Sequence, residues 1–173
     1  MEKARRTISE INRMTAKEFV RTIGPVFEHS PWIAEKAVTL RPFADLDILH
    51  RTLCKIVSTS AQEEQLALIQ AHPDLVGRAA WQGTLTAEST REQTSAGLGQ
   101  LAHEEIESFQ KFNTAYREKF GFPFVICARL NKKEAILSGF QVRLKNSRET
   151  EIKTALEEIF KIARLRLQDL TAP

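Results

Sequence analysis

The stretch AHEEIESFQKFNTAYREKFG, residues 102–121, has the longest helical pattern in the chain. Ile106, Phe109 and Tyr116 are separated by three and seven positions, so they share one face of an α-helix. Gly121 supplies the left-handed backbone conformation with which many helices end. The stretch therefore predicts a long amphipathic helix that stops at Gly121.

Helical signals extend from this stretch in both directions. Toward the N-terminus, Thr15 and Glu18 have the spacing of a capping box, as do Ser60 and Glu63. Between these two boxes lies an apolar stripe at helical spacing, made of Leu46, Leu49, Leu53, Ile56 and Val57. Toward the C-terminus, residues 132–144 and 147–170 predict two more helices, with Asn146 between them.

Two stretches lack this periodicity. Residues 73–88 carry two glycines and a proline and predict a loop, whereas FPFVICARL, residues 122–130, predicts a buried extended segment. Residues 1–14 are polar and are expected to be loosely ordered. No internal repeat or linker is visible in residues 1–173, so we expect an all-α fold, a single compact domain of six to eight helices.

Composition limits the possible partners and the compartment. The 173 residues carry a net charge of +3, and acidic and basic residues are mixed along the chain, so we expect no nucleic-acid partner. No stretch approaches the roughly 20 apolar residues of a membrane span, and no signal peptide is visible. Cys54 and Cys127 are far apart and form no CxxC pair, which predicts reduced thiols in a cytoplasmic protein.

The stretch QAHPDLVGRAA, residues 70–80, contains the first candidate for chemistry. Pro73 disfavours a helical backbone for the residue before it, so His72 should lie where a helix breaks. A histidine has an ordinary pKa of about 6.5, which suits a general acid or base. The alternative is that His72 only complements the negative end of a helix dipole.

A second candidate site is STREQ, residues 89–93. Ser89 and Glu92 have capping-box spacing, so Glu92 could simply bond to the start of its own helix. The alternative is that backbone donors and short polar side chains gather there to bind an anion or a polar heterocycle. Local sequence leaves both interpretations open.

Two other kinds of site find less support. His103 and Glu107 lie one helical turn apart, as half of a zinc-hydrolase site would, but no third ligand is identifiable and a solvated helix face is the simpler interpretation. His29 and His50 carry no motif and are read as structural, and no serine or cysteine has a recognisable neighbouring base. A helical nucleic-acid-binding or regulatory module is the remaining alternative, although no recognition helix with clustered Arg and Asn is visible.

Five stretches taken together resemble one family. They are HPDLVGR, LTAESTREQTSAGL, FNTAYREKFGFPFVICARL, ILSGFQVRLKNSRETE and KIARLRLQDL. Their order and spacing are similar to those of the 2-oxo-4-hydroxy-4-carboxy-5-ureidoimidazoline (OHCU) decarboxylases of urate breakdown, over roughly residues 12 to 170. The resemblance implies an all-α homodimer that converts OHCU into (S)-allantoin and carbon dioxide without a metal or an organic cofactor.

The resemblance also implies the site residues. The family's catalytic histidine, glutamate and arginine match His72, Glu92 and Arg166, although Arg164 is only two positions from Arg166. The substrate-binding residues match Pro73, Ser89, Glu92, Gln93, Phe124, Val125 and Ile126. In this interpretation His72 handles a proton, Arg166 holds a carboxylate or carbonyl, backbone groups near Phe124 bind amides, and the Phe124 ring excludes water.

Overall fold

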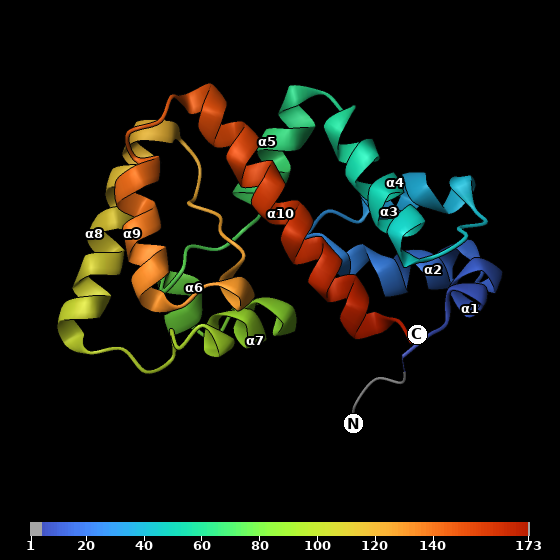
Figure 1. Cartoon of the computed structure of the whole chain (residues 1–173), viewed down its shortest axis with the longest axis horizontal. Coiled ribbons are helices and arrows are strands. Elements are labelled where there is room, and N and C mark those ends of the chain that lie inside the picture. The colour runs from blue at the N-terminus through green and yellow to red at the C-terminus, as the bar shows by residue number, and fades with distance from the viewer. Residues whose placement is uncertain (1–4, 173) are drawn as a thin grey trace. The chain divides into compact units, whose positions relative to one another are not determined.

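The computed structural model describes residues 5–172, and for residue 79 only the backbone (Figure 1). The described residues contain ten α-helices and three short 3-10 helices, with no β-strand among them. The α-helices are α1 (Ile8–Arg13), α2 (Ala16–Ile23), α3 (Trp32–Ala37), α4 (Leu46–Ser58), α5 (Gln62–Gln70), α6 (Arg78–Trp81), α7 (Ala87–Ser95), α8 (His103–Phe120), α9 (Lys133–Arg143) and α10 (Arg148–Leu170). Seven of them have eight residues or more. The all-α prediction is therefore confirmed.

Two compact units can be distinguished along the chain. Unit 1 contains the residues up to Ala71 and those from Phe160 onward, and unit 2 contains His72–Ile159. No helix in the described part of the chain is long and apolar enough to cross a membrane.

Unit 1 is built on the stripe that the sequence predicts for α4. Leu49, Leu53 and Val57 are fully buried on that helix, because α4 packs against α3 and α5. The capping box of Thr15 and Glu18 at the start of α2 is also confirmed, with Glu18 accepting from the Thr15 backbone N–H at 2.8 Å. Burial of such apolar side chains is the main term that stabilises a helical unit.

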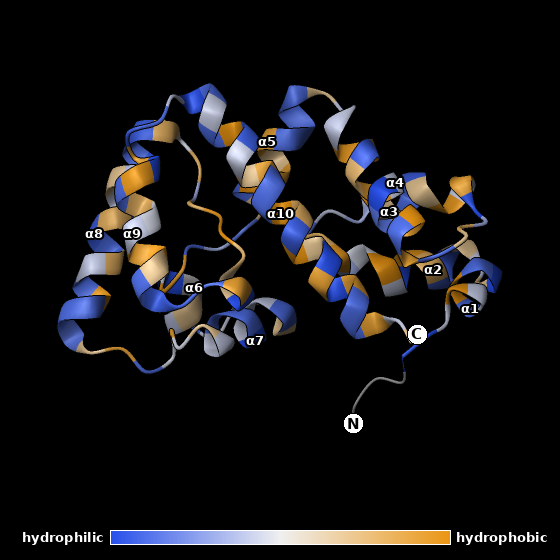
Figure 2. Ribbon diagram, in the orientation of Figure 1, coloured by the Kyte–Doolittle hydropathy of each residue, from blue (hydrophilic) through white to orange (hydrophobic). Residues whose placement is uncertain are grey.

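Unit 2 has an aromatic core. The Tyr116 and Phe140 rings, from α8 and α9, are buried there with the Phe122 and Phe124 rings from the connection between the two helices. That connection is rich in apolar residues, as its orange colour shows (Figure 2). As predicted, α8 ends at Gly121 in the left-handed conformation, with φ at 80°, and the stretch after it is non-helical and largely buried up to the 3-10 helix η3 (Ala128–Leu130).

Three local predictions are wrong. Residues 8–13 are not loose but form α1, because Thr7 and Glu10 make a capping box and Ile11 is buried in unit 1. Residues 1–4 of that prediction lie outside the described residues. The stretch 73–88 is not all loop, since it contains the four-residue helix α6 and the start of α7.

The third correction concerns the start of α5. Its N-cap is Ala61, and the Glu64 carboxylate accepts from the Ala61 backbone N–H at 3.3 Å. Ser60 is unavailable as a cap, because its hydroxyl donates to the Val57 carbonyl at 2.8 Å and so helps to close the preceding helix. The predicted capping box of Ser60 with Glu63 is therefore wrong, because the helix starts one residue later and Ala61 has no side-chain acceptor to complete a box with Glu64.

Candidate functional site

His72 lies where the sequence predicts a break. Helix α5 ends at Gln70 with Ala71 as its C-cap, and His72 follows as the first residue of unit 2. Its side chain is buried, with only 6% of the residue exposed. Proline at the next position cannot continue the helix, so the imidazole is attached to a backbone with restricted freedom.

The loop after His72 is held by side chains from two helices. The Gln93 side-chain amide on α7 accepts from the Val76 N–H at 3.1 Å and donates to the Asp74 carbonyl at 3.4 Å. On α8, Asn113 donates to the Leu75 carbonyl at 2.7 Å. The loop is therefore fixed through its backbone, a role that no local sequence signal for Gln93 or Asn113 revealed.

This anchoring maintains a strained backbone. Val76 has φ at 53°, a conformation that is an outlier for a β-branched residue and that costs of order 1–3 kcal/mol. The Asp74 carboxylate also accepts from Arg117 Nε at 2.9 and 3.0 Å, and a Cβ on Gly77 would lie 2.6 Å from the Asp74 Cβ. The surrounding contacts therefore determine the conformation of residues 72–77 closely.

Helix α7 begins earlier than its predicted capping box. The N-cap is Thr86, whose hydroxyl oxygen accepts from the Ser89 N–H at 3.2 Å, so the expected box of Ser89 with Glu92 is wrong. Thr86 is the N-cap because its backbone is extended and the helix begins at the next residue. Ser89 already lies inside the helix and so cannot cap it. Ser89, Glu92 and Gln93 are all buried, which places a carboxylate in the interior instead of at the helix start.

In the segment of residues 122–127, the predicted site residue Phe124 is packed into the core through its ring. Phe124 is 1% exposed, and its ring is stacked on that of Phe140 at 3.8 Å between centroids. The ring therefore belongs to the aromatic core of unit 2, and its expected role in excluding water from substrate stays a prediction. Within residues 5–172 the backbone of Phe124 and Ile126 makes no hydrogen bond, whereas the Val125 carbonyl accepts from Arg143 Nη1 at 2.6 Å.

Helix α7 is the common neighbour of the predicted site elements in unit 2. Gln93 connects it to the loop after His72, and α7 also packs against η3, which follows the segment of residues 122–127. The structure thus brings two stretches that are distant in sequence, the loop of residues 72–77 and η3, to one helix.

The predicted arginine belongs to unit 1. Arg166 is 4% exposed, and its Nη1 donates to Glu28 Oε2 at 2.9 Å and to the Pro25 carbonyl at 3.2 Å. Arg164 is more exposed and pairs with Asp47. Of the two arginines, Arg166 is thus the buried one with a fixed guanidinium.

The other residues considered from the sequence are His103, Glu107, His50 and Cys54. His103 and Glu107 form an exposed pair at 3.1 Å, and the described residues contain no group of three or more potential metal ligands. His50 Nε2 lies 3.3 Å from Cys54 Sγ, a proximity that no sequence motif revealed. The same nitrogen lies 2.8 Å from the Phe160 carbonyl, to which it can only donate, and burial raises the pKa of the Cys54 thiol to about 12. Both effects oppose formation of a nucleophilic thiolate.

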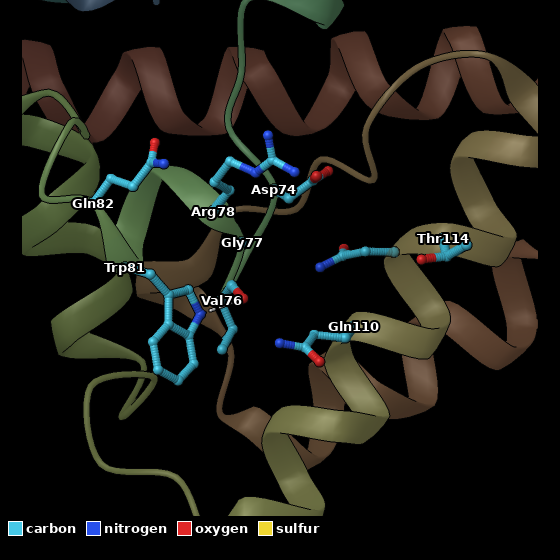
Figure 3. Close-up of a pocket in the computed structure, with 9 residues that line it drawn as sticks. Asp74, Val76, Gly77, Arg78, Trp81, Gln82, Gln110 and Thr114 are labelled. Atoms are coloured by element: carbon cyan, nitrogen blue, oxygen red, sulfur yellow. Dashed lines mark hydrogen bonds between the residues drawn. The ribbon is translucent and has the colours of Figure 1, made fainter.

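A pocket of about 740 Å³ lies beside the loop after His72 (Figure 3). Asp74, Val76 and Trp81 line one side, and Gln110 and Thr114 of α8 line the other. None of His72, Glu92 or Gln93 lines this pocket. It is therefore not the site that the sequence predicts, although it shares the same loop.

Comparisons with known proteins agree on one family. The model of the OHCU decarboxylase family matches residues 12–168. The OHCU decarboxylase of Haloferax volcanii is 40% identical over 94% of this chain and 95% of its own length, and that of Mus musculus is 41% identical over 93% and 90%. The uric acid degradation bifunctional protein of Bacillus subtilis is 42% identical over 95% of this chain, but the chain spans only 32% of that longer protein.

Solved structures have the same fold as this chain. A crystal structure of (S)-allantoin synthase superposes with a TM-score of 0.79 and 28% identity, over 96% of this chain and 54% of that chain. A crystal structure of an OHCU decarboxylase in the presence of (S)-allantoin has a TM-score of 0.66 at 24% identity, over 80% and 89%, and shows the fold alone. The chain belongs to the OHCU decarboxylase family.

Proposed function

We propose that this protein converts OHCU into (S)-allantoin and carbon dioxide in urate breakdown. The observation that carries the proposal is the family match over residues 12–168, which includes His72, Glu92 and Arg166 and extends through both units. For the same reason we propose that residues 1–173 act as one functional domain.

The substrate itself supplies what decarboxylation needs. One ring carbon of OHCU carries both a carboxylate and a hydroxyl, next to a C=N bond. When the bond to the carboxylate breaks, its electron pair forms a C=C bond to the imine carbon, and the imine nitrogen accepts the displaced electrons and takes up a proton. The hydroxyl then loses its proton and becomes a carbonyl, and the former imine carbon gains a proton. Because the electron sink is part of the substrate, we propose that the reaction uses no metal and no organic cofactor.

The protein then has to orient the ring and control protons. We assign the proton-handling role to His72, because its imidazole is buried on a loop that Gln93 and Asn113 fix. Glu92 orients His72 or binds ureido N–H groups, and Arg166 binds a carboxylate or carbonyl through its planar fork of donors. Ser89, Pro73 and the backbone of residues 124–126 complete the substrate contacts, and Gln93 contributes chiefly by holding the loop.

A direct assay tests this function. OHCU generated from urate is mixed with the protein, and circular dichroism follows the appearance of optically active allantoin. Because OHCU also decays spontaneously, the reaction without protein is the control. Faster decay with accumulation of the (S)-enantiomer supports the proposal, and a rate and optical activity equal to the control would contradict it.

We further propose a cytoplasmic homodimer. Support for the compartment comes from Cys54 and Cys127, which are both free thiols, and the dimer is what the family resemblance implies. Light scattering after size exclusion should give twice the chain's mass of 19.7 kDa. A mass of 19.7 kDa at micromolar concentration would contradict the dimer.

A further inference from the structure

The predicted substrate-binding segment is anchored along one edge. The Val125 carbonyl accepts from Arg143 Nη1 at 2.6 Å, and the Cys127 N–H donates to Glu158 Oε2 at 2.8 Å. In extended backbone the N–H and C=O groups of alternate residues point to the same edge. Residues 125 and 127 therefore form an edge that is bonded to α9 and α10.

The opposite edge has no such partners. Within residues 5–172, no group donates to or accepts from the backbone of Phe124 or Ile126. Backbone N–H and C=O groups that are shielded from water need a partner, so these groups are suited to a ligand that offers both donors and acceptors. The ureido and ring amide groups of OHCU have this character.

Arg143 is itself held rigidly. It is 8% exposed, its Nε donates to Glu151 Oε2 at 2.8 Å, and its guanidinium carbon lies 4.2 Å from the centroid of the Phe124 ring. Glu151 is fully buried and also accepts from the Tyr116 hydroxyl and from Asn146 Nδ2. One guanidinium thus touches both the backbone and a ring of the binding segment.

We infer that Arg143, fixed by Glu151, is a positioning residue that directs the Phe124 and Ile126 backbone groups toward substrate, an inference that rests on the proposed function. Replacing a buried ion pair with apolar residues is often neutral or stabilising, so stability alone does not explain why this pair is present. The planar guanidinium gives a reason for the pair, because Arg143 donates to Glu151 and to the Val125 carbonyl from different nitrogens at once.

This role predicts a particular kinetic pattern. The amide groups that the Phe124 and Ile126 edge would bind are present in substrate, transition state and product alike. Loss of their alignment therefore removes uniform binding, which raises KM and leaves kcat almost unchanged. Proton transfer by His72 would give the opposite pattern.

The test uses a double variant of the full chain, Arg143→Met with Glu151→Gln, which avoids a stranded buried charge. We expect the Kd for (S)-allantoin, measured by calorimetry, and the KM for OHCU to rise about tenfold, with kcat within about threefold of wild type. The matched control is Arg148→Met. Arg148 Nε also donates to a carbonyl, that of Phe120 at 3.0 Å, and its guanidinium carbon lies 5.6 Å from the centroid of the Phe122 ring. Its contacts therefore precede the backbone of residues 124–126.

A second pair of variants covers the possibility that the double variant does not fold. Glu158→Ala removes the acceptor of the Cys127 N–H from a half-buried position on α10, and Glu157→Ala changes the exposed neighbouring residue. We expect the Kd for (S)-allantoin to rise about threefold or more with Glu158→Ala and to stay unchanged with Glu157→Ala.

Two results would overturn the inference. One is a folded double variant, or Glu158→Ala, with Kd and KM within the error of wild type. The other is an equal rise in the Arg148→Met or Glu157→Ala control, which would indicate a general structural effect. If the wild-type protein itself neither turns over OHCU nor binds (S)-allantoin, the proposed function fails first, and that outcome is recognisable without any variant.

Discussion

All three predicted catalytic side chains, His72, Glu92 and Arg166, are ionisable groups that lie inside the protein. Burial of an unpaired charge is costly, and Glu28 offsets this cost for Arg166 at 2.9 Å. Breaking such a pair typically costs about 3–5 kcal/mol, because the remaining charge is left uncompensated. Lost activity in an Arg166→Ala variant would therefore mix stability with catalysis, and His72 offers the cleaner test.

Replacement of His72 by alanine should abolish most turnover while the fold persists. General acid–base catalysis is worth about 10²–10⁴-fold, so kcat for OHCU should fall by that factor. The matched control is His103→Ala, since His103 is exposed and pairs only with Glu107 across one helical turn. Near-wild-type turnover of fresh OHCU by the His72→Ala protein, with native circular dichroism, would contradict the assignment.

Cys54 illustrates how burial changes a residue that could otherwise react. Its thiol lies beside His50, yet burial raises its pKa from 9.0 to about 12. A folded-state pKa above the unfolded one stabilises the protein below pH 9, and that contribution is lost as pH rises from 9 toward 12. The site therefore adds to alkaline sensitivity and not to catalysis.

The measurement is the free energy of unfolding in urea at pH 8 and pH 10.5 for wild type and Cys54→Ala. Wild type should lose more stability between the two pH values than the variant does, because only wild type carries the thiol. Burial also raises the pKa of Tyr116, but that residue is common to both proteins and its effect cancels. Parallel losses in the two proteins would show that the Cys54 pKa is not raised.

At the scale of elements, the site depends on how a loop and a helix hold each other. The loop of residues 72–77 has no regular structure of its own, and Gln93 from α7 bonds to its backbone twice. Val76 keeps an unfavourable φ only because these bonds and those from α8 maintain it. A change that moves the loop should therefore affect His72 without altering its chemistry.

Gly77→Ala provides that change. The new Cβ would lie 2.6 Å from the Asp74 Cβ, so the loop must shift. We expect a loss of about 1–3 kcal/mol in unfolding free energy and a fall of about 10–100-fold in kcat/KM. Gly99→Ala is the control, because a Cβ there meets nothing within 4 Å. Equal activity of the two variants would show that the loop position does not matter.

At the scale of the whole molecule, the residues proposed for catalysis are distributed over both units. His72 and Glu92 belong to unit 2 and Arg166 belongs to unit 1, and the family match extends through both. The boundary between the units falls within α10, at Phe160. The proposed function is therefore assigned to both units together and not to one of them alone.

Product binding should stabilise the whole chain by mass action. At a concentration of (S)-allantoin ten times its Kd, the gain is about 1.4 kcal/mol, which for a chain of this length corresponds to a rise in Tm of about 3–5 °C. The (R)-enantiomer serves as the control, and we expect a smaller shift with it. Equal shifts with both enantiomers would argue against a stereospecific site.

The sequence by itself determined the fold class and most helices, because helix formation depends on local periodicity, capping and helix-stopping residues. It correctly predicted α8 with its Gly121 end, the α4 stripe and the break before His72. It failed where two adjacent residues compete for one cap, as Ser60 and Ala61 do, since that outcome depends on other bonds of the serine.

Only the tertiary structure decided how the site is supported. Gln93, Asn113 and Arg143 all bond to backbone groups that are 17 to 38 positions away in the sequence. No local pattern encodes such pairings, because any side-chain amide or guanidinium can satisfy any carbonyl until the chain is folded. The packing of the Phe124 ring in the core could likewise not be predicted from the sequence. It depends on the position of Phe140, on which the ring is stacked.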